Sequence, residues 1–376
     1  MWVCGKKIMK IFVTGTRGIP DIPGGVEKHC QELYPLIAAQ GQEILLATRK
    51  TYVNGTRPGA WNGVRLVHTF APHKKSLEAI VHTFLAILKA RLANPDIVHI
   101  HAVGPGLMAP FARFLGLRVV VTNHGPDYDR QKWGKSAKMM LRLGEYCGGR
   151  FGNQVIVISR VIADIIRTRC SRESNLVYNG VPIPEKSEST SFLTKIGVTP
   201  GKYVLAVSRF VPEKGLDILI RAFRNVEGDY KLVIAGDADH ESEYSRELKA
   251  MIAEDTRVIS TGYITGEPLN QVFSNARLFV LPSFHEGLPI ALLEAMSYGL
   301  SVLVSDIPAN MEVDLAPERY FRCGDETDLT TRMKALLKQE LTEIEKRDMR
   351  LQIAEKYNWL KIAEQTVEVY RKAMKR

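Results

Sequence analysis

Short runs of aliphatic and β-branched residues alternate with longer segments of helical periodicity from residue 8 onward. This alternation is typical of βαβ units, in which helices join parallel strands of one sheet. The pattern breaks once and then starts again, so it predicts an α/β chain with two doubly wound sheets. The expected strands are KIFVTG, EILLAT, VRLVHTF, DIVHIHA, RVVVTNHG and VIVIS in the first half, and YVLAVSRF, YKLVIAGDA, RVISTGYI, ARLFVLPS and SVLVSD in the second.

The break is the segment VYNGVPIPEKSEST, where Asn-Gly and two prolines interrupt regular structure. A chain of 376 residues also exceeds what one hydrophobic core usually serves. We expect a first domain over 1–185, a second over 186–355, and a C-terminal helix over 356–376 that packs back towards the first domain. Residues 1–8 are expected to have no structural consequence, and 340–376 to be wholly helical.

Binding residues of doubly wound sheets lie at the carboxyl ends of the strands. Two such sheets that face each other predict a pocket in the cleft between the domains. The residues that follow each expected strand are therefore the candidates for a functional site.

The formal net charge of +10 admits three kinds of partner: nucleic acid, anionic lipid or a phosphate-rich substrate. No zinc spacing, RNA-recognition aromatic motif or basic zipper supports a nucleic-acid-binding protein. The five scattered cysteines form no Cys-x-x-Cys pair, which indicates reduced thiols. No apolar run approaches the roughly 20 residues that cross a bilayer, and no signal peptide opens the chain. A cytoplasmic protein is expected.

Two carboxylates stand out in the largely apolar stretch FHEGLPIALLEAMSYG, residues 284–299. Pro289 suits the first turn of a helix, so the helix is expected to begin near Leu288. Glu286 then lies in the loop before the helix, and Glu294 is buried about two turns inside it. A loop carboxylate and a helical carboxylate at the end of a strand indicate a site.

Gly24 and Gly25 precede a helix that is expected to begin near Val26. Backbone N–H groups and the positive end of a helix favour an anion there. The sequence is neither Gly-x-Gly-x-x-Gly nor a Walker A loop, which argues against a dehydrogenase and a P-loop kinase. A turn that uses glycine for its dihedral freedom is the alternative.

Arg209 and Lys214 lie after the first strand of the second half, in SRFVPEKGLDILIRAF. A planar guanidinium and a compact ammonium together suit a diphosphate. A close charge pair at an effective dielectric of 20 is worth about 4 kcal/mol before desolvation, against roughly 0.3–1 kcal/mol for a helix terminus. These two cations are therefore expected to contribute more to anion binding than the helix terminus does. The alternative is a solvated loop of mixed charge.

His124 follows a strand of the first half, in VVVTNHGPDYD. A hydrogen bond at a turn is the alternative explanation for a single histidine at that place. Asp127-x-Asp129 and Asp237-x-Asp239 each spell a metal-binding dipeptide, but about one such match is expected by chance in a chain of this length. No metal site is predicted from them.

Together these segments resemble glycosyltransferase family 4, which comprises retaining enzymes of the GT-B fold. The matching residues are GGVEKH, NHG, VSRFVPEKG, IAGDAD and, most specifically, HEGLPIALLEAMSYG. The first half also resembles a subgroup from bacterial polysaccharide clusters that includes rhamnosyltransferases. The resemblance implies two Rossmann-like domains that face an interdomain cleft, with C-terminal helices.

The resemblance also implies residue roles. Arg209 and Lys214 match the cations that hold the donor diphosphate, which Gly24 and Gly25 approach from the other domain. Glu294 matches the carboxylate that binds the nucleotide ribose. The donor-sugar site is implied at Glu286 and His124, with the neighbouring backbone of Gly287 and Leu288.

The implied activity is retaining, metal-independent transfer of a sugar, such as rhamnose, from a nucleoside-diphosphate sugar to a saccharide acceptor on a lipid carrier. No cofactor is implied. Two alternatives stay open: a sugar-nucleotide epimerase of similar two-domain build, and a basic nucleic-acid-binding protein. The location implied is the cytoplasmic face of the membrane.

A basic segment between Arg130 and Arg150 supports contact with an anionic membrane surface. Lys135, Lys138 and Arg142 share one helical face, Met139, Leu143 and Tyr146 share another, Trp133 lies upstream, and Glu145 is the one acid. Polybasic segments gain roughly 1 kcal/mol per residue near anionic lipid. The alternative is a helix whose apolar face packs on the sheet.

Overall fold

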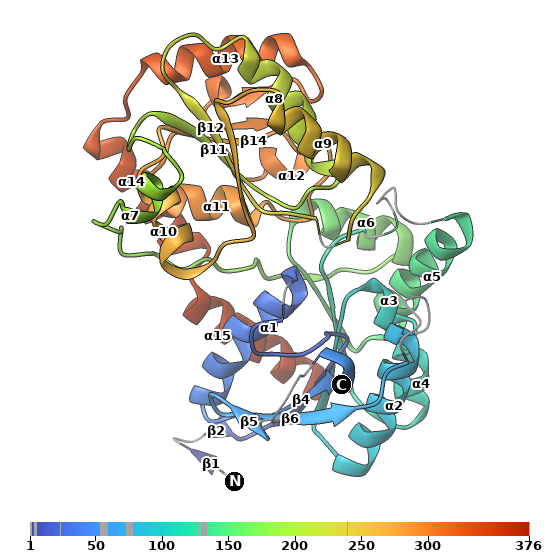
Figure 1. Cartoon of the computed structure of the whole chain (residues 1–376). Coiled ribbons are helices and arrows are strands. Elements are labelled where there is room, and N and C mark those ends of the chain that lie inside the picture. The colour runs from blue at the N-terminus through green and yellow to red at the C-terminus, as the bar shows by residue number, and fades with distance from the viewer. Residues whose placement is uncertain are drawn as a thin grey trace. The chain divides into compact units, whose positions relative to one another are not determined.

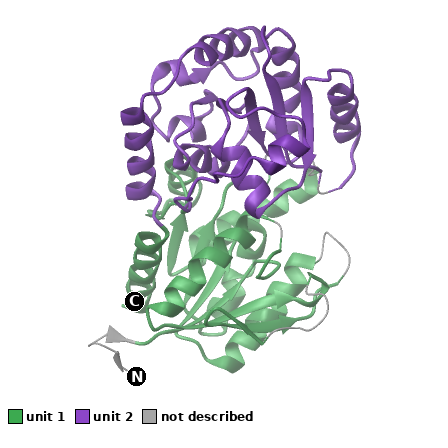
Figure 2. Ribbon diagram, turned by 60° about the vertical axis from the view of Figure 1, so that its left-hand side comes forward, with its two compact units in different colours: residues 1–180, 359–376 green, residues 181–358 purple. Residues whose placement is uncertain are grey.

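The computed structural model describes residues 2–3, 6–22, 24–52, 59–72, 78–126, 128, 134–238 and 240–375. The chain divides into two compact units, green and purple in Figure 2. Unit 1 comprises Met1–Gly180 and Trp359–Arg376, and unit 2 comprises Val181–Asn358. The sequence predicted the boundary after residue 185 and the start of the returning helix at residue 356, whereas the structure has the boundary after Gly180 and the return at Trp359.

Unit 1 is built on an eight-stranded sheet in the order β10-β9-β8-β7-β3-β4-β6-β5. The chain winds outward from β3 through β4 to β6, returns to β7, and winds outward on the other side, so the sheet is doubly wound. Its described strands run parallel except for the pair β5 and β6. The strands are β3 (Lys10–Thr14), β4 (Glu43–Arg49), β5 (Ala60–Trp61), β6 (Val64–Thr69), β7 (Ile97–His101), β8 (Val119–Asn123), β9 (Gln154–Val157) and β10 (Asn175–Leu176).

Helices cover both faces of this sheet. Ile11 and Val13 of β3 pack in one core cluster with α1 and α15, whereas Phe12 packs on the opposite face in the cluster of α2 and α4. Successive strand residues point to opposite faces, so β3 needs an unbroken apolar run. The helices of unit 1 are α1 (Gly25–Ala39), α2 (Glu78–Ala93), α3 (Val103–Gly106), α4 (Ala109–Phe114), α5 (Lys135–Phe151), α6 (Arg160–Cys170) and α15 (Trp359–Met374), with a 3-10 turn η1 (Lys50–Tyr52).

Unit 2 repeats the plan with six parallel strands in the order β13-β12-β11-β14-β15-β16. Its core cluster joins the strands to α8 and α13. The strands are β11 (Tyr203–Val207), β12 (Lys231–Ala235), β13 (Val258–Gly262), β14 (Leu278–Leu281), β15 (Val302–Ser305) and β16 (Tyr320–Phe321). The helices are α7 (Ser191–Lys195), η3 (Pro212–Lys214), α8 (Leu216–Arg224), α9 (Glu243–Ala253), α10 (Gly266–Ser274), α11 (Ile290–Ser297), α12 (Pro308–Met311), η4 (Pro317–Arg319), α13 (Glu326–Lys338) and α14 (Glu343–Lys356).

The stretch 340–376, predicted to be wholly helical, contains two separate helices that belong to different units. The break falls at Tyr357 and Asn358, between α14 and α15. The buried stripe of α15 includes Ile362, Val367 and Tyr370, and this helix lies beside α1 in unit 1 (Figure 1). The first residues also form a small antiparallel pair, β1 (Trp2–Val3) with β2 (Lys6–Lys7).

Helix α5 turns apolar side chains outward. Met139, Leu143 and Tyr146 are exposed by 71%, 52% and 46%, so they do not pack on the sheet. The packing stripe is instead Leu141 with glycines, and Gly144 touches α3 so closely that a Cβ there would lie 2.2 Å from the Val103 carbonyl oxygen. Trp133 lies outside the described residues.

Candidate functional site

Each sheet has a switch point, where the chain reverses the direction in which it adds strands. In unit 1 this point lies between β3 and β7, and in unit 2 between β11 and β14. Ligands of open α/β sheets bind outside the carboxyl ends of strands at such points. The candidate residues lie after β3 and β8 of unit 1 and after β11 and β14 of unit 2, with Glu294 in the helix that follows β14.

In unit 2, the loops after β11 and β14 contact each other directly. Gly215, at φ 61°, lies so close to the second loop that a Cβ would sit 2.4 Å from the Pro282 carbonyl oxygen. The backbone N–H of Phe284 also donates to the Glu213 carbonyl oxygen at 2.9 Å. The loop that carries Arg209 and the loop that carries Glu286 therefore form one edge of the unit.

An ion pair links the two loops. Lys214 Nζ donates to Glu286 Oε1 at 2.5 Å, and Ser283 Oγ donates to the same oxygen at 2.7 Å. The Lys214 and Glu286 side chains are 19% and 10% exposed. The structure thus joins two of the predicted residues, and Glu286 lies in the loop, as predicted.

The helix after this loop begins later than predicted. Pro289 is the N-cap and α11 starts at Ile290, so Glu294 lies about one turn inside the helix instead of two. Glu294 is half-buried, whereas the sequence predicted that it is buried. Leu288 is buried and Gly287 half-buried in the turn before the cap. Burial, with the Glu294 carboxylate as a further cause, raises the pKa of Tyr298 to about 12.

Asp237 already forms an ion pair with a lysine of the same unit. Lys249 Nζ lies 2.9 Å from Asp237 Oδ1, which also accepts the Ala238 N–H. The hydrogen bond from Lys249 holds the pKa of the Asp237 carboxyl below its usual value. Asp127, Asp129 and Asp239 lie outside the described residues.

In unit 1, Gly24 caps α1 and Gly25 is its first residue. A carboxylate already lies at this helix end: Glu27, in the first turn, accepts the Arg17 backbone N–H at 2.9 Å and the Arg17 Nε–H at 3.2 Å. A Cβ at Gly24 would meet the Glu27 and Arg17 side chains at 2.1 and 2.3 Å. The crowding of this turn therefore accounts for glycine at position 24 without any bound ligand.

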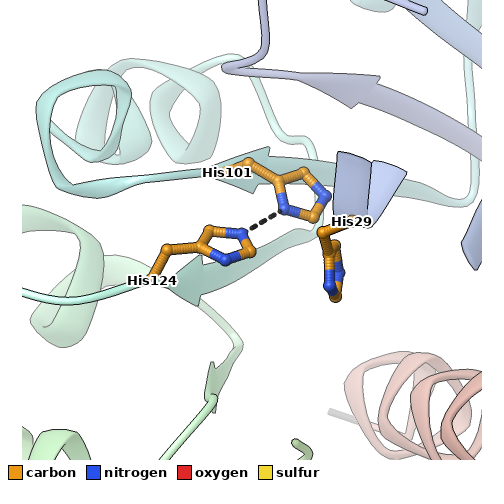
Figure 3. Close-up of side chains that lie close together, drawn as sticks. All are labelled: His29, His101 and His124. Carbon is orange, nitrogen blue, oxygen red and sulfur yellow. Dashed lines mark hydrogen bonds between the residues drawn. The ribbon is translucent and has the colours of Figure 1, made fainter. Parts of the chain in front are cut away.

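Three histidines meet at the carboxyl ends of β7 and β8. His101 is the last residue of β7, His124 follows β8, and His29 comes from α1 (Figure 3). Nδ1 of His101 and Nε2 of His124 are 2.9 Å apart and share a hydrogen bond. The His29 ring stands edge-on to the His124 ring, with centroids 4.9 Å apart.

The hydrogen bonds continue into the core of unit 1. The Tyr34 hydroxyl bonds His101 Nε2 at 2.5 Å and His99 Nδ1 at 2.9 Å, and His99 Nε2 bonds Thr122 Oγ1 at 2.7 Å. We call the series His124, His101, Tyr34, His99 and Thr122 the imidazole chain. The Tyr370 hydroxyl of α15 joins it at His99 Nδ1, at 2.7 Å.

Sequence reasoning found His124 and missed the rest of this cluster. The one available signal was HIH in the strand DIVHIHA, where two histidines at period 2 share a face of a buried strand. His29 lies in the matching segment GGVEKH but was given no role, and nothing local marked Tyr34 or Tyr370.

The rings of the cluster are neutral at pH 7. Burial lowers the pKa of His29 to about 4 and that of His99 to about 3. Burial, and then the neighbouring histidines, holds the pKa values of His101 and His124 well below the usual range. A neutral imidazole donates through one nitrogen and accepts through the other, which suits hydroxyl groups.

The three rings offer one nitrogen each within 4.8 Å of one another, a set that could be read as a metal site. The geometry fits hydrogen bonding better. The facing nitrogens of His101 and His124 are already bonded to each other, and the second nitrogen of His101 bonds Tyr34. A metal ion would have to open these bonds to obtain the lone pairs it needs.

Models of two known domain families match the chain. Residues 23–184 match Glycosyltransferase Family 4, and residues 201–339 match Glycosyl transferases group 1.

Relatives share similarity over most of the chain. An uncharacterized glycosyltransferase of Methanocaldococcus jannaschii is 28% identical over 97% of this chain and 99% of its own. Alpha-maltose-1-phosphate synthase of Mycobacterium tuberculosis is 26% identical over 94% and 96%. A putative teichuronic acid biosynthesis glycosyltransferase of Bacillus subtilis is 23% identical over 63% and 58%.

Solved structures share the fold. Sucrose-phosphate synthase from Thermosynechococcus elongatus superposes with a TM-score of 0.81 at 20% identity, covering 96% of this chain and 98% of its own. Anabaena HepE in complex with UDP-glucose superposes with a TM-score of 0.77 at 18% identity and the same coverage. The first domain match covers the sheet of unit 1 from β4 onward and the second covers the sheet of unit 2, whereas each superposition covers 96% of the chain.

Proposed function

Because the chain is a glycosyltransferase of the GT-B type, we propose that it moves a sugar from a nucleoside-diphosphate sugar to a hydroxyl of a growing surface polysaccharide. The transfer retains the anomeric configuration and needs no metal ion or other cofactor. The observation that carries the proposal is the Lys214–Glu286 ion pair at the switch point of unit 2.

Lys214 can serve the donor diphosphate while it holds Glu286. An ammonium carries three N–H groups, and the bond to Glu286 uses one of them. Arg209, on the same loop, adds a guanidinium whose planar fork suits phosphate oxygens. The charge on the leaving nucleoside diphosphate grows as the glycosidic bond breaks, so these preorganised cations stabilise the transition state more than the bound donor.

Glu286 would lie beside the donor sugar, with its orientation fixed by Lys214 and Ser283. Glu294 would accept hydrogen bonds from the nucleotide ribose, and Gly287 and Leu288 would border the donor through their backbone. From unit 1, His124 would hydrogen-bond the sugar as a neutral ring, and the turn at Gly24 and Gly25 would approach the diphosphate.

Two relatives support the substrate class. HepE binds UDP-glucose, which is a nucleoside-diphosphate sugar. The putative glycosyltransferase of Bacillus subtilis is named for teichuronic acid biosynthesis. We propose rhamnose as one candidate sugar and a lipid carrier as the anchor of the acceptor.

The test is a panel of nucleoside-diphosphate sugars, including rhamnosyl donors, offered with saccharide acceptors and read by mass spectrometry. Arg209→Ala and Lys214→Ala should each lower turnover on the order of 10²–10³-fold. Lys202→Ala is the matched control, because Lys202 also pairs with a carboxylate of unit 2, Asp229 at 3.2 Å. Full turnover in both loop variants would exclude the diphosphate role.

Two further readouts refine the assignment. Proton NMR of the first product reports whether the anomeric configuration is retained. Incubation with the donor alone distinguishes a glycosyltransferase from a sugar-nucleotide epimerase. Steady isomerisation of the donor sugar would indicate an epimerase.

We also propose that α5 docks on an anionic membrane. Its outward face combines the exposed apolar side chains of Met139, Leu143 and Tyr146 with the exposed cations of Lys135 and Arg142. The one acid of the segment, Glu145, points inward and bonds Asn123 and Tyr128. Apolar groups beside cations, with no acid among them on this face, suit anionic lipid. Among the described helices, none is long and apolar enough to span a bilayer.

Sedimentation with phosphatidylcholine vesicles, with and without phosphatidylglycerol, tests this docking. We expect salt-sensitive binding to the anionic vesicles, weakened by Leu143→Ser and by Lys135→Glu. Leu351→Ser is the apolar control, because Leu351 of unit 2 is exposed to a similar extent, 58% against 52%. Equal sedimentation with both vesicle types would contradict the docking.

A further inference from the structure

The carbonyl group of Ser283 needs a hydrogen-bond donor from outside the sheet. The register of β14 and β15 ends at the pair of Leu281 and Val304, two residues before Ser283. Ser283 is fully buried, and no backbone N–H of the described residues donates to its carbonyl oxygen. Because a buried carbonyl oxygen without a partner is costly, a side chain has to supply the donor that the ladder lacks.

Ser305, the last residue of β15, supplies that donor. Its Oγ lies 2.5 Å from the Ser283 carbonyl oxygen and donates to it. A carbonyl oxygen only accepts, so the direction of this bond is fixed. The Cys323 thiol faces the same oxygen, but at 3.9 Å and as a weak donor. The Ser305 hydroxyl therefore makes the main bond of the Ser283 carbonyl group.

Asn310 of α12 orients the Ser305 hydroxyl. Its Nδ2 donates to the Ser305 carbonyl oxygen at 2.9 Å and to Ser305 Oγ at 3.1 Å. The first bond fixes the amide, because only the NH2 group can donate to a carbonyl oxygen. Ser305 Oγ thus accepts from Asn310 and gives its single proton to Ser283. Both Ser305 and Asn310 are fully buried, so water does not compete for these bonds.

The serine whose backbone is held in this way also bonds the carboxylate of the candidate site. Ser283 Oγ donates to Glu286 Oε1 at 2.7 Å, and Lys214 Nζ reaches the same oxygen from the other loop. The direction of the Ser283 side chain depends on its backbone, which Ser305 fixes. The bonds therefore form one series from Asn310 through Ser305 and Ser283 to Glu286.

We infer that Ser305 and Asn310 are positioning residues that hold Glu286 in place through Ser283. On the proposed function, which this inference builds on, they set the direction of the carboxylate beside the donor sugar. The cations for the diphosphate belong to the loop after β11, which neither residue bonds. Loss of the series should therefore slow the transfer of the sugar without weakening the binding of the nucleoside diphosphate.

Hydrogen exchange of the segment 282–289, followed by mass spectrometry without any ligand, tests the anchor itself. Ser305→Ala should speed exchange in this segment about tenfold, because a buried carbonyl group loses its bond. Asn310→Ala should speed it less, since the Ser305 hydroxyl remains. Ser245→Ala is the matched control and should change nothing there, because Ser245 is a buried serine of α9 whose hydroxyl donates to the Ser242 carbonyl oxygen at 2.9 Å. Unchanged exchange in Ser305→Ala would overturn the inference.

Turnover separates a positioning role from a purely structural one. With the donor found by the panel above, Ser305→Ala should lower kcat about 10–100-fold and leave the affinity for the nucleoside diphosphate within about twofold. Ser283→Ala should lower kcat as well. The double variant should lose little more than either single variant, because both substitutions break the same series. Losses that multiply in the double variant, or full kcat in Ser305→Ala, would contradict positioning through Ser283.

The exchange measurement needs no donor, so its result stands apart from the proposed function. If the unchanged chain turns over no nucleoside-diphosphate sugar, the proposed function fails, and exchange still decides whether Ser305 anchors the loop. If turnover is found but Ser305→Ala exchanges like the unchanged chain, the inference alone fails.

Discussion

The two units share one plan, but their switch points differ in chemistry. In unit 2 the described site is ionic, with Lys214 and Glu286 in contact and Arg209 on the same loop. In unit 1 the corresponding place has the Arg17–Glu27 ion pair after β3 and, at the ends of β7 and β8, the neutral rings of the buried His101 and the half-buried His124. Charged groups suit a diphosphate, and neutral donors suit hydroxyl groups. On the proposed function, the edge of unit 2 would hold the phosphates of the donor and the edge of unit 1 would hold its sugar.

The difference extends to composition. Seven of the nine histidines lie in the residues of unit 1, and unit 2 has His240 and His285. All four tryptophans also belong to unit 1. Tryptophan emission therefore reports on unit 1 alone, which makes the comparison measurable.

Acid should affect unit 1 most strongly. The pKa values of His29, His82 and His99 fall from 6.5 to about 4, 3 and 3 through burial. Between these values and 6.5 the unfolded chain binds more protons than the folded one, so stability falls as the pH drops below 6.5. At pH 5 each ring lowers the free energy of unfolding by about 2 kcal/mol. The three rings together lower it by about 6 kcal/mol, which is a large part of the stability of a typical domain.

Urea unfolding followed by tryptophan emission at pH 7.5 and pH 5 measures this loss. We expect the midpoint to fall steeply at pH 5, while circular dichroism retains the contribution of unit 2. The same midpoint at both values of pH would mean that the rings are not buried neutral.

In unit 2, Glu294→Ala should weaken donor binding more than it weakens the fold. Loss of hydrogen bonds to a charged group costs about 1.5–3 kcal/mol, which corresponds to roughly 10–100-fold in affinity. Calorimetric titration of the donor measures the loss, with Glu254→Ala, an exposed glutamate of the same unit, as control. Equal donor affinity in both variants would remove Glu294 from the ribose site.

At the edge of unit 1, Gly180→Ala should displace Trp359. A Cβ at Gly180 would lie 2.4 Å from the indole ring, whose neighbour is His29 at 5.6 Å between centroids. Overpacking of this kind costs about 1–3 kcal/mol. We expect shifted tryptophan emission and a lower midpoint.

Gly59→Ala is the control for that substitution, because a Cβ there meets no heavy atom within 4 Å. The double variant Gly180→Ala with Trp359→Leu should recover part of the loss, since the smaller side chain makes room. An unshifted emission spectrum in Gly180→Ala would show that the contact is not tight.

The smallest effect is expected on the outer face of α5. Met139→Ser and Leu143→Ser should change the free energy of unfolding by less than about 0.5 kcal/mol, because both side chains are exposed. Thermal unfolding in the absence of lipid measures this. A loss of 2 kcal/mol or more would show that this face packs on protein.

The sequence predicted the fold because every long strand is an apolar run between helical segments. It missed the two-residue strands β1, β2, β5, β10 and β16, which are too short to show a period. In α5, the packing stripe includes Gly144 and Gly148. Glycine carries no hydrophobic signal, so the sequence left open whether the apolar side chains of this helix pack on the sheet or face outward, and the structure has Met139, Leu143 and Tyr146 exposed.

The ionic site was easier to predict than the neutral one. Lys214 and Glu286 sit in loops after predicted strands, where a charged residue is conspicuous. The imidazole chain draws its members from α1, β7, β8 and α15, and only the strand order brings them together. Its neutrality is a result of burial, which no local pattern of residues reports.

The most direct test compares nucleosides with nucleoside diphosphates by titration calorimetry, using the unchanged chain, Arg209→Ala and Lys214→Ala. The account predicts that the diphosphate binds the unchanged chain more tightly than its nucleoside, and that either substitution removes most of this advantage. If the advantage persists undiminished in both variants, the ionic edge of unit 2 does not hold the donor phosphates.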